Sequence, residues 1–197
     1  MAIKTSSLNN IVKILNLAER LKSELRHSWM SCSRQESVAE HSWRLSLMLV
    51  LLEPHLEQPI DMLKALKMAI IHDLVEAEVG DTPVFDIDEE KMKSKAILER
   101  RAIGNIRDTL GNEVGEDIYI LWHEFENRQT DEAKLVYALD KLECKLQHVE
   151  ADLSTWNEKE RNISFDWQDE LYDFEPIILQ LRDYLKQRSV EKVNAEV

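Results

Sequence analysis

Residues 68–81, which read M-A-I-I-H-D-L-V-E-A-E-V-G-D, place several ionisable side chains directly after an apolar run. His72 and Asp73 are adjacent, and Glu76 follows one helical turn later. On a helix these three side chains border one pocket, because residues three and four apart share a face. Such a group can hold a divalent cation and leave one carboxylate for acid–base chemistry, with Asp81 just beyond. An apolar helix that ends in a polar turn would give the same pattern, so a metal site needs partners elsewhere in the chain.

Two further residues are candidates to complete a metal site. His41 lies in the first turns of a largely apolar predicted helix, and Asp140 lies at the margin of an inward-facing stripe. Each also has a structural interpretation: His41 as a packed core histidine, and Asp140 as the partner of Lys141. Two imidazoles and two carboxylates suit manganese, cobalt, iron or zinc better than calcium. The prediction is one divalent transition metal ion bound by His41, Asp140, His72 and Asp73.

The composition indicates a single helical domain. Of the 197 residues, 44% are hydrophobic and 32% charged, and only four glycines and four prolines occur. This content fits one folded domain over residues 1–197 and disfavours a β-rich fold with many tight turns. The formal net charge of −13 repels polyanions, so nucleic-acid polymers and anionic membranes are poor partners.

Helical periodicity predicts an all-α bundle that positions these residues. We expect a core from about residue 8 to 153, and a charged tail at 188–197 that frays. Ser37 and Glu40 have the S-x-x-E spacing of a capping box, which predicts the start of the helix that carries His41. Residues 26–36 lack the helical period and are predicted to form a loop. The predicted helices span about residues 8–25, 37–52, 62–76, 89–110, 114–125, 131–153 and 170–187.

The cysteines and the N-terminus indicate a cytoplasmic protein. Cys32 and Cys144 form no C-x-x-C pair, so free thiols in a reducing compartment are expected. The N-terminus lacks the apolar segment of a secretory signal, and the longest apolar run, residues 45–52, is too short to span a bilayer.

Three segments resemble motifs of the HD-domain phosphohydrolases, and most closely the single-domain 5′-deoxynucleotidases of that family. Residues 36–42 read E-S-V-A-E-H-S and resemble the motif E-S/N-V-S/A-E/D-H. Residues 72–81 resemble H-D-x-x-E-x-x-x-G-D. Residues 132–134, E-A-K, lead to L-D-K-L-E at 139–143 and resemble the segment E-A-K…D-K/Q-x-E. The similarity covers about residues 15–150.

The resemblance implies a role for each candidate residue. It makes His41, His72, Asp73 and Asp140 the metal ligands. Glu76 would act on the attacking water, and Asp81 would contact the sugar or fix the site. Arg26 and Trp29 would recognise the phosphate and the sugar, although in some family members this arginine and tryptophan are adjacent and here two residues separate them. The resemblance also implies a homodimer.

The expected reaction is hydrolysis of a nucleoside 5′-monophosphate, with a preference for deoxy forms. A bound cation lowers the pKa of water and withdraws charge from a phosphoryl oxygen. Glu76 takes the proton of the water, and Arg26 neutralises the phosphate oxygens. Trp29 would form a wall against the 2′ position of the sugar. Two alternatives stay open: hydrolysis of another nucleotide, such as a triphosphate or a signalling nucleotide, and a non-catalytic binding or scaffold protein that a metal stabilises.

Overall fold

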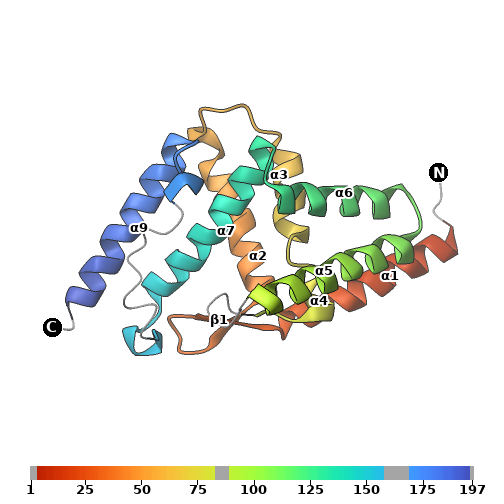
Figure 1. Ribbon diagram of the computed structural model, residues 1–197, viewed down its shortest axis with the longest axis horizontal. Helices are drawn as coiled ribbons and strands as arrows, with labels where there is room; N and C mark the ends of the chain where they lie inside the picture. Colours follow the sequence, from red (N-terminus) through yellow and green to blue (C-terminus); the bar gives the residue numbers. More distant parts are fainter. Residues whose placement is uncertain (1–3, 83–88, 158–168, 196–197) are drawn as a thin grey trace.

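Helices make up most of the computed structural model, which describes residues 4–82, 89–157 and 169–195 (Figure 1). The predicted all-α fold is confirmed, with one small hairpin added to it. The α-helices are α1 (Thr5–Ala18), α2 (Val38–Leu52), α3 (Met62–Ile71), α4 (Glu76–Val79), α5 (Glu89–Leu110), α6 (Glu113–Asn127), α7 (Asp131–Glu150) and α9 (Pro176–Asn194). Short 3₁₀ helices occupy η1 (Glu19–Lys22), η2 (Glu53–His55), η4 (Leu153–Thr155) and η5 (Asp169–Leu171). The strands are β1 (Leu25–Trp29) and β2 (Gln35–Ser37).

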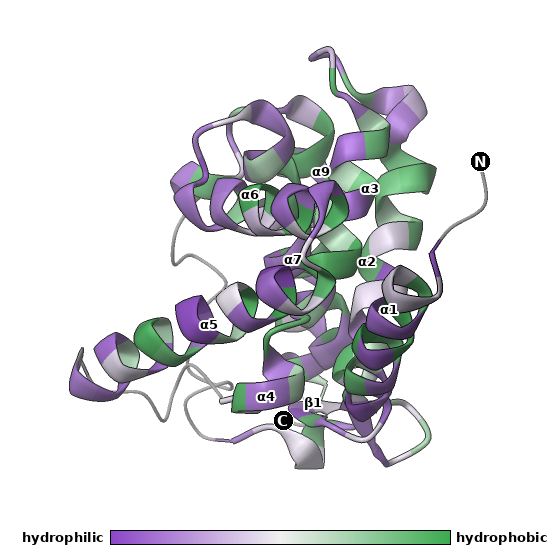
Figure 2. Ribbon diagram, turned by 90° about the vertical axis from the view of Figure 1, so that its right-hand side faces the viewer, coloured by the Kyte–Doolittle hydropathy of each residue, from purple (hydrophilic) through white to green (hydrophobic). Residues whose placement is uncertain are grey.

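Helix α7 lies at the centre of the larger core and packs against α2, α3, α6 and α9 (Figure 1). Its fully buried apolar side chains include Leu135, Leu139 and Leu142, which meet Leu45 of α2 and Met68 of α3. Figure 2 shows α2 and α3 as largely hydrophobic, whereas α5 alternates between hydrophilic and hydrophobic residues. Burial of apolar side chains therefore fixes α2, α3 and α7 against one another, since such burial is the main driving force of folding.

A second core joins α1, α4, α5 and α6. Ile103 and Ile106 of α5 are fully buried there, together with Val75 and Trp122. The indole Nε1 of Trp122 donates a hydrogen bond to the carbonyl oxygen of His72 at 3.0 Å. This contact ties the end of α3 to α6 and holds the segment on which His72 lies.

The predicted helix over residues 62–76 is interrupted, and this changes the local geometry of the site. Helix α3 ends at Ile71, a turn covers residues 72–75, and α4 begins at Glu76. Hydrogen bonds between residues three apart tighten this turn, including the one from Glu76 N to Asp73 O at 3.0 Å. The sequence pattern predicted His72, Asp73 and Glu76 on one continuous helix, and this prediction is wrong.

Three other boundaries differ from the prediction. Residues 26–36 are not a loop but contain most of the antiparallel hairpin of β1 and β2. The first helix ends as η1 and is followed by β1, so it does not reach residue 25. Helix α9 begins at Pro176 and continues to Asn194. Proline is a favoured residue at the first position of a helix. The predicted start of this helix at residue 170 is therefore wrong, and so is the predicted fraying of residues 188–194, which are helical. The division into a single domain stays a prediction. Residues 83–88, which lie between the predicted helices at 62–76 and 89–110, are outside the described residues.

The capping box of α2 is confirmed. Ser37 Oγ accepts a hydrogen bond from Glu40 N at 3.3 Å, and Glu40 Oε2 accepts one from Ser37 N at 2.9 Å. Arg34 donates to the same Glu40 carboxylate and lowers the pKa of Glu40 to about 2. These contacts fix the first turn of the helix that carries His41.

Replacing Ser37 by alanine is expected to destabilise the protein, because it leaves a backbone N–H of the first turn of α2 without its acceptor. The expected loss is about 1 kcal/mol in the free energy of unfolding and about 2–4 °C in the melting temperature. Thermal and chemical unfolding measure both quantities. Ser94→Ala on the exposed surface of α5 is the control, and an equal effect of the two substitutions would contradict a capping role for Ser37.

Across the part of the chain that the structure describes, no helix combines the length and apolar character that crossing a membrane requires.

Candidate metal centre and active site

The four candidate ligands converge where α2, α3 and α7 pack together. His41 lies in the first turns of α2, His72 and Asp73 directly follow α3, and Asp140 lies in the middle of α7. His41 Nε2 is 3.1 Å from Asp140 Oδ1 and 3.8 Å from Asp73 Oδ2. His72 Nε2 is 3.1 Å from the same Asp73 oxygen. Side chains that are up to 99 residues apart in the sequence therefore form one buried cluster.

The histidines present their Nε2 atoms as metal ligands would. Both atoms are buried and have no hydrogen-bond partner among the described residues, although each faces a carboxylate oxygen. The opposite nitrogen of His72 donates to the carbonyl oxygen of Ala69 at 2.9 Å, which leaves the Nε2 lone pair directed at the cluster. A histidine whose second nitrogen is held in this way is typical of metal sites. Ligand atoms of His41, His72 and Asp73 all lie within 4.8 Å of one another, so the donor set fits a divalent ion.

Asp140 has both of the contacts that the sequence left as alternatives. Its Oδ2 lies 2.9 Å from Lys141 Nζ, and its Oδ1 faces His41. Burial by itself raises the pKa of the Asp140 carboxyl, but Lys141 and His41 outweigh it and hold this pKa well below its usual value. The pKa of Asp73 is also lowered, since His72 and His41 outweigh its burial. Both carboxyl groups are therefore ionised, as metal ligands must be.

Glu143 orients His41 and was not singled out as a site residue by the sequence. One of its carboxylate oxygens pairs with His41 Nδ1, and the other accepts a hydrogen bond from Arg44 Nε at 2.6 Å. Burial raises the pKa of Glu143, but His41, Arg44 and Arg26 outweigh it and keep the pKa below its usual value. The available signal was the spacing of three residues from Asp140, which places both acids on one face of α7.

Glu76 lies beside the cluster as the first residue of α4. The residue is buried, and burial together with the charges of Asp73 and Asp81 raises the pKa of its carboxyl group to about 9. Its Oε1 is 3.6 Å from Lys95 Nζ, while its Oε2 is buried with no hydrogen-bond partner among the described residues. A buried carboxyl group with a raised pKa next to a polar cluster is a candidate for acid–base chemistry. Lys95 was missed because the sequence placed it only on a charged helix.

Asp81 is held close to these groups by a turn at Gly80. Gly80 has a φ of 79°, which favours glycine, and the following Asp81 N donates to Glu24 Oε1 at 3.0 Å. Burial raises the pKa of Asp81; Arg26 opposes this shift and Asp73 adds to it. Asp81 therefore lies within electrostatic range of both Arg26 and the candidate ligand Asp73.

Arg26 reaches the cluster from β1, but Trp29 does not join it. Arg26 Nη1 is 3.5 Å from Asp73 Oδ2, and Nη2 donates to Cys144 Sγ at 2.7 Å. Trp29 ends the same strand, where its carbonyl oxygen accepts a hydrogen bond from Gln147 at 2.6 Å. Its half-buried indole makes no hydrogen bond or ring contact with the cluster within the described residues.

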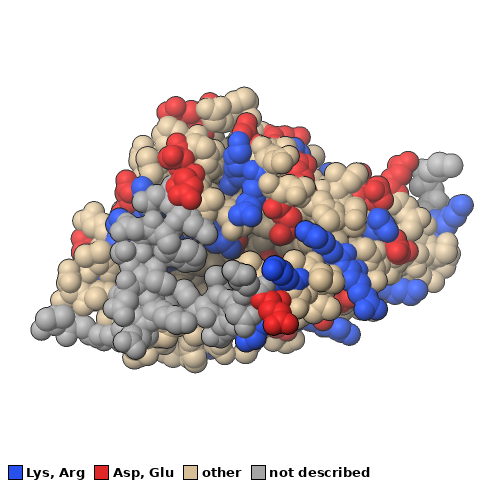
Figure 3. Space-filling model, in the orientation of Figure 1, with Lys and Arg blue, Asp and Glu red and all other residues tan. Residues whose placement is uncertain are grey.

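Basic side chains surround the cluster despite the negative charge of the chain. Arg26 and Lys141 lie within ion-pair distance of its acids Asp73 and Asp140. Lys95 lies within ion-pair distance of Glu76 beside the cluster. Figure 3 shows lysine and arginine side chains on both sides of a hollow between α5 and α7. These basic side chains at the edge of the cluster suit an anionic ligand such as a phosphate.

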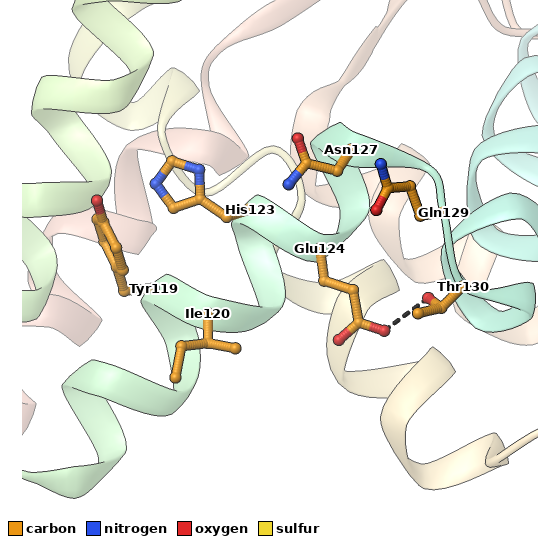
Figure 4. A pocket seen from close by; sticks show the side chains of 7 residues that line it. All are labelled: Tyr119, Ile120, His123, Glu124, Asn127, Gln129 and Thr130. Carbon is orange, nitrogen blue, oxygen red and sulfur yellow. Dashed lines mark hydrogen bonds between the residues drawn. The ribbon is translucent and has the colours of Figure 1, made fainter.

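A separate pocket of about 560 Å³ lies on α6 and the turn that follows it (Figure 4). It shares no residue with the cluster, and its Glu124 side chain accepts a hydrogen bond from Thr130 Oγ1 at 2.6 Å. The lining residues are Tyr119, Ile120, His123, Glu124, Asn127, Gln129 and Thr130.

Comparison with known proteins identifies the fold family. The model of the HD domain matches residues 18–178, a range that includes every residue of the cluster. This chain belongs to the HD-domain family.

Relatives of this HD-domain protein from distant organisms are named 5′-deoxynucleotidases. A 5′-deoxynucleotidase HDDC2 of Dictyostelium discoideum is 37% identical over 73% of this chain and 78% of its own length. The 5′-deoxynucleotidase hdd1 of Schizosaccharomyces pombe is 30% identical over 91% of this chain and 90% of its own. A crystal structure from Magnetospirillum magnetotacticum, described as a predicted metal-dependent phosphohydrolase, superposes with a TM-score of 0.77 at 28% identity and covers 96% of both chains.

Proposed function

We propose that this protein is a metal-dependent phosphohydrolase that removes the 5′-phosphate from nucleoside 5′-monophosphates and prefers the deoxy forms. The observation that carries the proposal is the buried pair of His41 and His72. Their Nε2 atoms face Asp140 and Asp73 and have no hydrogen-bond partner in the described part of the chain. The names of the relatives supply the substrate class.

Each residue has a distinct role in this proposal. His41, His72, Asp73 and Asp140 hold the ion, which when bound lowers the pKa of water and withdraws charge from a phosphoryl oxygen. The raised pKa of Glu76 belongs to the site without an ion, and the charge of a bound cation favours the ionised carboxylate. In that form its Oε2, which has no hydrogen-bond partner within the described residues, orients the attacking water and accepts its proton.

The substrate is bound by residues around the ion site. Arg26 binds phosphate oxygens through paired hydrogen bonds from its guanidinium, and Asp81 contacts the sugar. A role for Trp29 against the 2′ position rests on the resemblance alone. The ion is manganese, cobalt, iron or zinc, a set that the mixture of nitrogen and oxygen donors favours over calcium.

A phosphate-release screen tests the proposal. The purified protein is incubated with nucleoside mono-, di- and triphosphates, in ribo and deoxy forms, with each of these four metals. We expect release from deoxynucleoside monophosphates only when metal is present. Hydrolysis of triphosphates or signalling nucleotides instead would favour the alternative HD hydrolase. No release from any nucleotide, with metal still bound, would favour the non-catalytic binding or scaffold protein.

Replacing Arg26 by alanine is expected to weaken substrate binding. Loss of one charge-assisted contact costs about 1.5–3 kcal/mol, so kcat/KM should fall roughly tenfold to hundredfold, mainly through KM. Steady-state kinetics and metal analysis measure the two effects separately. Arg101→Ala on the exposed face of α5 is the control. Unchanged kcat and KM in Arg26→Ala would return Arg26 to a purely structural role.

We also propose a homodimer in the cytoplasm. The resemblance implies the dimer, and an exposed apolar stripe along α2 supports it, since Trp43 is 66% exposed and Leu51 62%. Light scattering at several concentrations measures the mass, and a monomer throughout would contradict the dimer. The cytoplasmic location rests on Cys32 and Cys144, both of which are free thiols.

A further inference from the structure

Lys95 joins the site from a helix outside the three family motifs. It lies on α5, and its Nζ is 3.6 Å from Glu76 Oε1 and 3.4 Å from Glu99 Oε1. Glu99 is one helical turn further along α5, so the ammonium group is held between an acid of its own helix and an acid of α4. Nothing in the mechanism above uses this contact.

The burial of Glu76 and the acids around it explain why a cation is needed at this position. The Glu76 side chain is only 7% exposed, and Asp73 and Asp81 act on it as nearby like charges. A buried carboxylate in such a place is costly unless a cation accompanies it. Within the described residues, Lys95 forms an ion pair with this carboxylate through Oε1.

The two oxygens of Glu76 are thereby made different. Oε1 forms the ion pair with Lys95, whereas Oε2 is buried with no hydrogen-bond partner among the described residues. A base must present one lone pair in a fixed direction, because a misplacement of the catalytic group by about 1 Å strongly lowers the reaction rate. A cation that binds one oxygen from the side of α5 restricts rotation of the carboxylate and leaves the other oxygen available.

We propose that Lys95 is a positioning residue for Glu76: it holds Oε1 so that Oε2 accepts the proton of the attacking water. This inference rests on the proposed function. Lys95 acts through Glu76 and does not bind the phosphate. Glu99 assists by fixing the ammonium group.

Three full-length variants test the role. Lys95→Gln removes the charge, Lys95→Arg keeps it, and Lys93→Gln changes an exposed lysine two residues away on α5. Steady-state kinetics on a deoxynucleoside monophosphate give kcat and KM, metal analysis gives the bound ion, and thermal unfolding reports the fold. We expect kcat of Lys95→Gln to fall about tenfold or more, with KM within about twofold and metal content unchanged. Lys95→Arg should recover most of the loss, and Lys93→Gln should match the unmodified protein.

Each other outcome overturns the inference in a recognisable way. A kcat of Lys95→Gln equal to that of Lys93→Gln means that Glu76 needs no positioning cation. A raised KM with unchanged kcat means that Lys95 binds the phosphate directly. Loss of metal together with activity means that Lys95 supports the fold of the site. Failure of the proposed function looks different, because the unmodified protein itself then releases no phosphate from any nucleotide.

Discussion

Replacing Glu76 by glutamine is expected to abolish phosphate release while the metal stays bound. Glutamine keeps the shape of the side chain but cannot accept a proton, and loss of a general base typically costs about 10²–10⁴-fold in rate. Glu76 is not one of the four proposed ligands, so the ion should be retained. The measurements are kcat on a deoxynucleoside monophosphate and the metal content per chain.

The neighbouring Glu78 provides the matched control. It lies two residues away on the same short helix α4 and is exposed, with its carboxylate bound to Asn105. Glu78→Gln should leave both kcat and metal content unchanged. If Glu76→Gln or Glu76→Ala turns over substrate at the normal rate, the role of Glu76 as the base is wrong even though the metal site stands.

Replacing a proposed ligand is expected to remove metal and activity together. His41→Ala deletes one of the two imidazoles, and Asp73→Asn keeps the shape of the side chain while removing its charge. Each loss should weaken metal binding by more than about a hundredfold, since even outer partners of ligands contribute 10–100-fold. Metal analysis after dialysis, kcat, and the shift of the melting temperature with added metal measure the effect.

The shape-preserving variant separates loss of the ion from loss of the fold. His41 is fully buried, so His41→Ala also leaves a cavity, whereas Asp73 has an 18% exposed side chain and Asp73→Asn leaves none. Asp117→Asn on the exposed surface of α6 is the control. A full metal complement in either variant would exclude that residue from the ligand set.

Together, the substitutions of Glu76 and of the proposed ligands distinguish a catalytic metal site from a metal that only stabilises the fold. A catalytic site loses activity with the metal retained when Glu76 is changed, and loses both when a ligand is changed. A metal that only stabilises the fold makes Glu76 dispensable, because a structural ion needs no free carboxylate beside it. The pattern across these substitutions is therefore more informative than any one of them.

Local signals determined much of this protein from the sequence. The capping box of Ser37 and Glu40 could be predicted because its hydrogen bonds join residues three apart. The inward stripe of α7 could be predicted because one face of a helix repeats every 3.6 residues. The same spacing placed Asp140 at the edge of that stripe, and adjacency alone marked His72 and Asp73.

Long-range packing decided the rest. No local pattern indicates that the turn at residues 72–75 separates His72 from Glu76, because the hydrogen bond of Trp122 to His72 comes from α6. The strand that carries Arg26 is short and irregular in register, so it shows no clear alternation in the sequence. Lys95 and Glu143 gained their roles only through contacts with Glu76 and His41, which are distant in the chain. The sequence by itself determined the elements and the residue types of the site, since these follow from neighbours along the chain; tertiary structure decided which side chains meet, since that follows from how the helices pack.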